Sequence, residues 1–264
     1  MYNFEYHNPK TVADAAKLVA GKDEAKLLAG GMTLIPTLKQ RLAKPSDLVD
    51  LGKIGELKGI KRDGNAVVIG AMTKHADVAG SDVVKSAIPA LAHLAEGIGD
   101  PQVRNRGTIG GSIANNDPAA DYPAGVLALN ATIITNKRKI AADDFFKGMF
   151  ETALAADEII TAVSCPTADK AGYAKFPNPA SRYAMVGVFV AKSGAGVRVG
   201  VTGAAPCVFR QKEMEAALTK AFSADAVAGI KQSASGLNSD IHGSAEYRAH
   251  LVTVMAKRAV AAAG

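Results

Sequence analysis

Apolar residues in the first 55 positions recur with two different spacings, which predict alternating strands and helices. Strands are expected at 4–6, 26–29 and 47–51, and helices, whose apolar residues lie three to four positions apart, at 12–20 and 34–44. Thr11 and Asp14 have the spacing of a capping pair at the start of the first helix. The resulting β-α-β-α-β order predicts a small lobe with a parallel sheet.

Residues 56–165 predict a second lobe, in which a hairpin precedes helices and further strands. The hairpin spans 57–69 and turns at Asp63-Gly64. Helices are expected from 73 and over 88–97, strands over 126–136 and 158–163 with a turn near Asn130, and a strand end or turn at 143–146.

Residues 166–264 predict a third lobe of α+β type. An apolar hairpin is expected at 186–191 and 197–201, followed by alanine-rich helices at 211–221, 224–235 and 245–263. Gly194, Gly196 and Gly200 miss the spacing of a dinucleotide-binding fingerprint, and they lie between two strands where that motif needs a strand followed by a helix. We interpret these glycines as a turn.

Composition and charge exclude several classes of function. The 264 residues are 48% hydrophobic and 21% charged, which is ordinary for a globular protein, and the net charge is +6. The densest basic cluster, Lys137-Arg138-Lys139, is interpreted as a solvated hairpin tip rather than a nucleic-acid patch. No apolar run is long enough to cross a membrane, and the N-terminus lacks the pattern of a signal peptide.

Cysteine content limits the metal chemistry of the chain. The two cysteines, Cys165 and Cys207, exclude a four-cysteine iron–sulfur or zinc site held by this chain alone, so no metal site is expected. Two free, buried thiols fit a reducing compartment, and the cytoplasm is the expected location. A P-loop pattern is also absent from the sequence.

Two diglycine segments, nearly eighty residues apart, each follow a hydrophobic run. The first is Leu-Leu-Ala-Gly-Gly-Met-Thr-Leu at 27–34, and the second is Gly-Thr-Ile-Gly-Gly-Ser-Ile-Ala at 107–114. Adjacent glycines let the backbone turn sharply and approach a ligand closely. Successive amides in such a loop form an anion-binding concavity, to which Thr33 and Ser112 would add hydroxyl groups. The two loops are therefore expected to form two walls of one cleft suited to a diphosphate.

The second segment lies in a long block, 98–124, that is rich in polar residues and marked by Pro and Gly at both ends. Three motifs from this block and the first segment, Ala-Gly-Gly-x-Thr-Leu at 29–34, Arg-Asn-x-Gly-Thr-Ile-Gly-Gly-Ser at 104–112 and Asp-Pro-Ala-Ala-Asp at 117–121, closely resemble the FAD-binding medium subunit of molybdenum hydroxylases. This is the family of xanthine dehydrogenase and carbon monoxide dehydrogenase, and the resemblance covers essentially the whole chain.

The resemblance implies an α+β, PCMH-type FAD-binding fold: two α/β lobes (1–55 and 56–165) that clamp FAD, and a C-terminal α+β lobe (166–264) with an antiparallel sheet and helices. Both glycine loops would hold the diphosphate of FAD. Asp121 would contact the ribityl or adenosine part, and Lys175 would lie near the pyrimidine edge of the flavin. Tyr183 would stack on the flavin ring. The implied cofactor-binding residues are Ala29, Gly30, Gly31, Met32, Thr33, Leu34, Thr108, Ile109, Gly110, Gly111, Ser112, Asp117, Asp121, Ile160, Lys175 and Tyr183.

Alternatives stay open at several of these positions. Asp121 could simply cap the next helix, Lys175 could be a solvated strand residue, and Tyr183 could be a core aromatic. Ile159 competes with Ile160 as the residue whose backbone approaches the flavin. His75 is interpreted as a helix-start residue rather than a base. Arg104 and Arg106 could contact phosphate, or they could brace the loop or a partner subunit. Arg182 stands where relatives often carry Asp.

The resemblance also implies a function. Substrate would be oxidised at a molybdenum–pterin centre on a large subunit, and electrons would pass through two [2Fe–2S] clusters on a small subunit to FAD on this chain. An external acceptor, which could be NAD, a quinone or oxygen, would then take them. The expected assembly is a dimer of heterotrimers, without nucleic acid. Two further hypotheses are a stand-alone FAD-dependent oxidoreductase and a non-catalytic module that has lost FAD.

Overall fold

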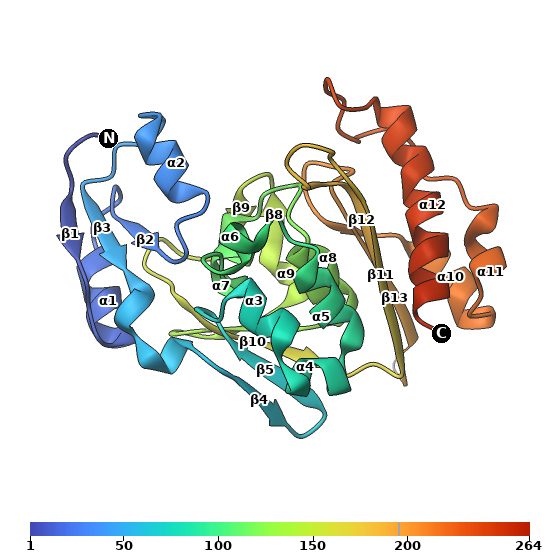
Figure 1. The fold of residues 1–264 in the computed structure, drawn as a ribbon, viewed down its shortest axis with the longest axis horizontal. Helices are drawn as coiled ribbons and strands as arrows, with labels where there is room; N and C mark the ends of the chain where they lie inside the picture. The colour runs from blue at the N-terminus through green and yellow to red at the C-terminus, as the bar shows by residue number, and fades with distance from the viewer. Residues whose placement is uncertain (195) are drawn as a thin grey trace.

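The computed structural model describes residues 1–194 and 196–264, which form three larger sheets and one two-stranded sheet, with helices between and around them (Figure 1). The N-terminal lobe is a three-stranded parallel sheet of order β1-β3-β2. Its elements are β1 (Glu5–His7), α1 (Val12–Val19), β2 (Lys26–Leu28), α2 (Leu34–Lys39) and β3 (Asp47–Asp50), followed by 3₁₀ turns at Leu51–Lys53 and Gly55–Leu57.

The predicted order of this lobe is confirmed, and so is its first cap. The Thr11 hydroxyl accepts a hydrogen bond from the Asp14 amide at 3.1 Å and donates to the Asp14 carboxylate at 2.7 Å. The second helix is shorter than predicted, because α2 ends at Lys39 and Arg41 has a positive φ of 59°. Leu42 therefore lies outside the helix and is exposed.

The middle lobe is a five-stranded sheet of order β4-β5-β10-β6-β7, antiparallel throughout. Its strands are β4 (Ile60–Asp63), β5 (Ala66–Gly70), β6 (Thr132–Thr135), β7 (Lys139–Ala141) and β10 (Ile160–Pro166), with a small pair formed by β8 (Phe146–Gly148) and β9 (Glu151–Thr152). Its helices are α3 (His75–Gly80), α4 (Asp82–Ala87), α5 (Pro89–Glu96), α6 (Pro101–Arg104), α7 (Ile109–Asn115), α8 (Tyr122–Ala128) and α9 (Ala142–Phe145).

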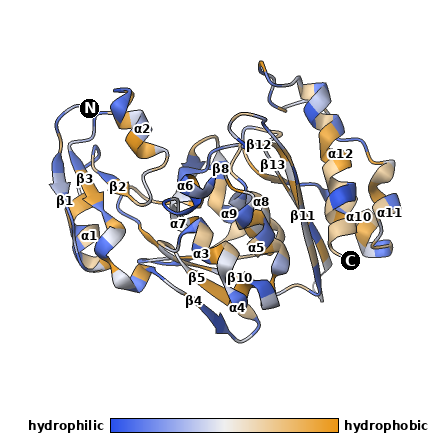
Figure 2. Cartoon of the chain, viewed as in Figure 1, coloured by the Kyte–Doolittle hydropathy of each residue, from blue (hydrophilic) through white to orange (hydrophobic). Residues whose placement is uncertain are grey.

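The predicted hairpin at Asp63-Gly64 is confirmed, and its hydrophilic tip stands out in Figure 2. Two other predictions for this lobe are partly wrong, and helix α4 was not predicted. The strand expected over 126–136 is present only as β6, which follows helix α8 and the predicted turn near Asn130, whose φ is +53°. Most of the segment expected to be a strand end or turn at 143–146 is helix α9. Every residue of α8 is buried, so the segment lacks the polar face that marks a helix in a sequence.

The C-terminal lobe is a four-stranded antiparallel sheet with three helices on its outer face (Figure 1). Its elements are β11 (Lys170–Pro177), β12 (Ala184–Ser193), β13 (Gly196–Thr202), β14 (Phe209–Arg210), α10 (Lys212–Lys220), α11 (Ala224–Ala228) and α12 (Ala245–Ala262). The predicted hairpin and helices are present, although α11 ends seven residues early. The predicted turn is confirmed for Gly194, whereas Gly200 lies inside strand β13.

This sheet is covered on both faces, which explains the long buried run of β12. Phe189 and Ala191 pack with the helices of the middle lobe, while Val188 and Val190 pack with the core under α10 and α12. Helix α8 comes close to β13 because Gly200 has no side chain: a Cβ there would overlap the carbonyl oxygen of Ala124. The middle lobe and the C-terminal sheet therefore share one core.

Candidate functional site

A cavity of about 570 Å³ lies where the three lobes meet. Its wall is mostly apolar, and its size is typical of a site for a small organic molecule or cofactor. All the predicted site residues form part of this wall except Ile109 and Lys175. The structure thus brings together segments that are more than 150 residues apart in the chain, from Ala29 to Tyr183.

The first glycine segment is a loop between β2 and α2, as predicted. Gly31 has a φ of +75°, which favours glycine. A Cβ on Gly30 would overlap the carbonyl oxygen of Arg106 and lie 2.8 Å from the Cα of Gly107. The backbones that carry the two glycine segments are therefore in direct contact.

The amides of this loop are not used in hydrogen bonds between the residues that the structure describes. Within residues 1–194 and 196–264, no group accepts a hydrogen bond from the N–H groups of Gly30, Gly31, Met32, Thr33 or Leu34. A run of unpaired amides in a cavity wall is the arrangement that proteins use to bind anionic oxygens.

The second glycine segment is the start of a helix, and the prediction of a loop is wrong. The Thr108 hydroxyl caps α7 by accepting from the Gly111 amide at 3.2 Å. The amides of Ile109 and Gly110 donate to the carbonyl oxygens of Thr73 and Ala71, at 3.1 and 2.9 Å. These bonds to the protein offset the low helix propensity of two glycines. They also leave the first turn of α7 without free amides, although Gly110, Gly111 and Ser112 form part of the cavity wall.

Gly111 marks the place where the two segments meet inside the cavity. A Cβ at this position would lie 3.1 Å from the Cβ of Ala29 and 3.0 Å from the Thr108 hydroxyl oxygen. Both distances are shorter than ordinary van der Waals contact, so a side chain here would require Ala29 or Thr108 to shift.

Asp121 occupies the N-cap position of helix α8, but its side chain makes no capping hydrogen bond, which corrects one of the alternatives. Its carboxylate is buried and accepts a hydrogen bond from the Tyr173 hydroxyl at 2.6 Å. Lys175 is not solvated either: its ammonium pairs with Asp121 and donates to the carbonyl oxygens of Gly97 and Arg182, at 2.7 and 3.0 Å. Asp121 contributes to the cavity wall, and Lys175 lies behind it.

Tyr183 is a cavity residue rather than a core aromatic, since 46% of it is exposed. Partial burial of the Tyr183 side chain raises the pKa of its hydroxyl, and the neighbouring carboxylates of Asp117 and Asp121 also raise it. The preceding residue, Arg182, has a φ of +61° and its carbonyl is held by Lys175. The buried lysine thus fixes the turn that presents Tyr183.

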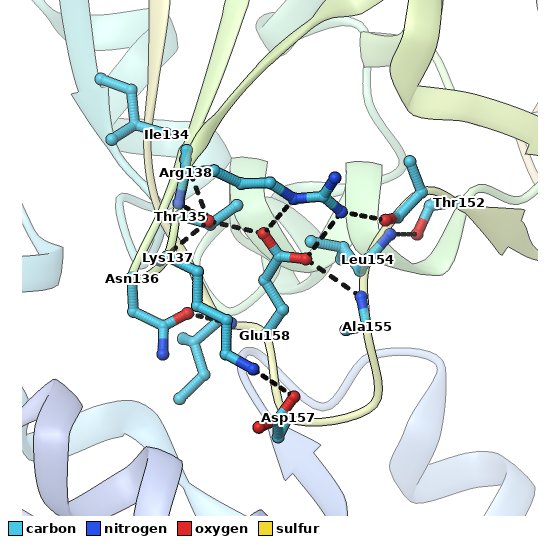
Figure 3. A network of polar contacts seen from close by, with 12 residues as sticks. Ile134, Thr135, Asn136, Lys137, Arg138, Thr152, Leu154, Ala155, Asp157 and Glu158 are labelled. Carbon is cyan, nitrogen blue, oxygen red and sulfur yellow. Dashed lines mark hydrogen bonds and ion pairs between the residues drawn. The ribbon is translucent and has the colours of Figure 1, made fainter.

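Sequence reasoning missed a polar network at the start of β10 (Figure 3). The buried Glu158 carboxylate accepts from the Arg138 guanidinium in a two-pronged arrangement, with both N···O distances at 3.0 Å. Thr135 donates to it at 2.7 Å. These donors, Arg138 foremost, lower the pKa of Glu158 to about 2. The signal available in the sequence was a charged residue, Glu158, directly before the apolar residues that begin the strand.

This network fixes the strand that lines the cavity beside it. Asn136 accepts from the Ile159 amide through its side chain at 2.9 Å and donates its own amide to the Ile159 carbonyl at 3.0 Å. Ile160 begins β10, whose pairing with β6 has an irregularity before Ala162. Both isoleucines contribute to the cavity wall, so the choice between them stays open.

Two comparisons by sequence cover nearly the whole chain. The family described as the FAD binding domain in molybdopterin dehydrogenase matches residues 2–168, and the carbon monoxide dehydrogenase flavoprotein C-terminal domain matches residues 171–263. The chain belongs to the FAD-binding medium subunits of the molybdenum hydroxylases. Like its relatives in this family, it is a subunit of an oxidoreductase.

The chain has similar sequence identity to several members of the family. The chain is 39% identical to the carbon monoxide dehydrogenase medium chain of Hydrogenophaga pseudoflava, over 98% of this chain and 96% of that one. It is 37% identical to the nicotine 6-hydroxylase medium subunit of Paenarthrobacter nicotinovorans, with the same coverage. Relatives that act on very different molecules are thus about equally similar to it.

Solved structures agree with the fold. Carbon monoxide dehydrogenase from Oligotropha carboxidovorans matches with a TM-score of 0.92 at 36% identity, over 99% of this chain and 97% of that one. Quinoline 2-oxidoreductase from Pseudomonas putida 86 matches with a TM-score of 0.90 at 28% identity, over 99% and 96%.

The described residues contain no cluster of His, Cys, Asp or Glu that could hold a metal ion. No helix in residues 1–194 or 196–264 is both long and apolar enough to cross a membrane.

Proposed function

We propose that this chain is the electron-transfer subunit of a molybdenum hydroxylase, taking electrons from [2Fe–2S] clusters on a small partner subunit and passing them to an external acceptor. The observation that carries the proposal is the cavity itself, where a loop with five unpaired amides faces the glycine turn of a capped helix. This arrangement lies in a chain whose family binds FAD.

The residues present fit the cofactor. The amides from Gly30 to Leu34 would hold diphosphate oxygens, and Gly111 would leave the backbone open on the opposite wall. Ile160 and Tyr183 would supply apolar surface for a planar ring, with the charge of Lys175 behind it. Bound flavin would supply the electron storage that no side chain can provide, while the protein supplies position and electrostatics.

The partners follow from the same proposal. A large molybdenum subunit would oxidise the substrate and a small iron–sulfur subunit would relay the electrons, in a dimer of heterotrimers. Relatives named for carbon monoxide, nicotine and glyceraldehyde are 37–39% identical to this chain, which supports substrate choice on another subunit. We place the complex in the cytoplasm, because both cysteines are unpaired thiols.

Purification from the native source tests the proposal. Flavin absorbance at about 450 nm, together with a large molybdenum subunit and a small iron–sulfur subunit, is the expected result. Flavin in a chain that turns over substrate without partners would instead establish a stand-alone oxidoreductase. A purified chain that neither contains FAD nor takes it up would overturn the proposal and indicate a module that has lost its cofactor.

A further inference from the structure

His75 is a buried histidine that forms part of the cavity wall. It is the first residue of α3, as predicted, and 5% of it is exposed. Its backbone amide donates to the Gly107 carbonyl at 3.0 Å, and its ring centroid lies 5.3 Å from that of Tyr122. The backbone of His75 is thus fixed against Gly107, and its ring packs against Tyr122.

The two ring nitrogens of His75 differ in their surroundings. Nδ1 is fully covered, and none of the residues that the structure describes offers it a hydrogen-bond partner. Burial and the nearby Arg104 guanidinium lower the pKa of His75 to about 4, so the ring carries one proton at neutral pH. A proton on Nδ1 would be a buried donor without an acceptor, which is costly, so the proton belongs on Nε2.

The Nε2 edge of the ring lies against the second glycine segment. A Cβ built on Gly107 would fall 2.5 Å from Nε2, so glycine at this position is what allows the ring to sit there. No acceptor for Nε2 occurs within residues 1–194 and 196–264, and the cavity is the space that remains for one. A fixed donor in such a wall loses little conformational freedom when a ligand binds.

We propose that the Nε2–H group of His75 donates a hydrogen bond to an oxygen atom of the bound dinucleotide, which makes His75 a cofactor-binding residue. The inference rests on the proposed function, because it requires FAD in this cavity. It assigns the glycine at position 107 a second role, that of giving the imidazole access to the ligand, in addition to its contact with Gly30.

A set of three variants tests this assignment. His75→Gln can place an amide N–H near the position of Nε2, His75→Asn can place one only near Nδ1, and His75→Phe keeps the ring but has no donor. The full chain, purified with any subunits that accompany it, is freed of FAD and titrated with FAD by quenching of flavin fluorescence. Melting temperatures of the FAD-free forms show that each variant is folded.

The expected result is that His75→Phe and His75→Asn bind FAD about tenfold more weakly than the wild type, as for one lost hydrogen bond, while His75→Gln stays within about threefold. Wild-type affinity in His75→Phe would overturn the inference and leave the proposed function intact. If that variant fails to fold, equal affinities of the Gln and Asn variants overturn it. A wild-type chain that takes up no FAD removes both the proposed function and this inference.

Discussion

Lys175 Nζ lies 2.8 Å from Asp121 Oδ1, and these side chains are only 10% and 4% exposed. The pair connects strand β11 to the start of α8, and so ties the C-terminal sheet to the middle lobe. Burial raises the pKa of Asp121, whereas Lys175 and the Tyr173 hydroxyl oppose this effect. Each charge is therefore tolerated because the other is present.

Removing one charge of this pair should destabilise the subunit more than removing both. Lys175→Met leaves a buried carboxylate with one hydroxyl donor, and we expect a loss of about 3 kcal/mol in the free energy of unfolding. Asp121→Asn combined with Lys175→Met should recover at least half of that loss. Urea unfolding of both single variants and the double variant measures the coupling. Additive effects would contradict the assignment of a coupled pair.

The Glu158–Arg138 pair should make stability sensitive to acid. The folded pKa of about 2 lies below the ordinary value of 4.5, so this stabilisation is complete above pH 4.5 and is lost as the pH falls towards 2. Glu158→Gln should be less stable at pH 7 and should flatten the pH dependence between 4.5 and 2. Unfolding curves at pH 7, 4 and 3 check this, with exposed Glu24→Gln as control. An unchanged slope in Glu158→Gln would refute the role of the pair.

Gly111→Val should abolish FAD retention. The added side chain would press on Ala29 and Thr108 and push the two glycine segments apart. FAD content after gel filtration, relative to protein, is the measurement. Gly229→Val is the matched control, because a Cβ there meets no atom within 4 Å. A folded Gly111→Val variant with a full complement of FAD would show that this junction does not touch the ligand.

Tyr183→Ala should weaken FAD binding about tenfold, since a stacked aromatic contributes about 1 kcal/mol beyond its buried area. Tyr183→Phe keeps the ring and should bind within about twofold of the wild type. Fluorescence titration distinguishes these cases, because loss of a stacked ring also raises flavin emission. Equal weakening by both substitutions would assign the effect to the hydroxyl group instead.

The two thiols should differ in reactivity. Burial raises the pKa of Cys165 to about 12, so its reactive thiolate is scarce at neutral pH, whereas Cys207 is half-buried. A chromogenic disulfide reagent should therefore titrate one thiol in the native chain and two in denaturant. Cys207→Ser should remove the native reaction, and a persistent fast signal in that variant would contradict the buried position of Cys165.

Local sequence signals predicted the N-terminal lobe well and the middle lobe less well. The cap at Thr11 and the hairpin at Asp63-Gly64 depend on residues a few positions apart, which a single sequence displays. Helix α8 depends on being enclosed by other elements. Its uniformly apolar stretch is compatible with either a strand or a helix, and only the surrounding structure decides between them.

In the candidate site too, the sequence revealed local motifs but not the contacts between distant residues. The glycine segments were visible as motifs, but the amides of the second one are used within the protein through contacts with Ala71 and Thr73. Arg138 was interpreted as part of a solvated tip, and it does lie at the β6–β7 turn. Its partner Glu158 is twenty residues away, and nothing in the sequence pairs the two.

The five unpaired amides from Gly30 to Leu34 have a consequence for the lifetime of the protein in the cell. They lie in the wall of the cavity between the first two lobes, where an anionic ligand would give them hydrogen-bond acceptors. Cofactor supply would then govern resistance to proteolysis as well as turnover, because only the native state binds FAD. A cell short of flavin would lose the subunit itself, and idle copies without cofactor would not accumulate.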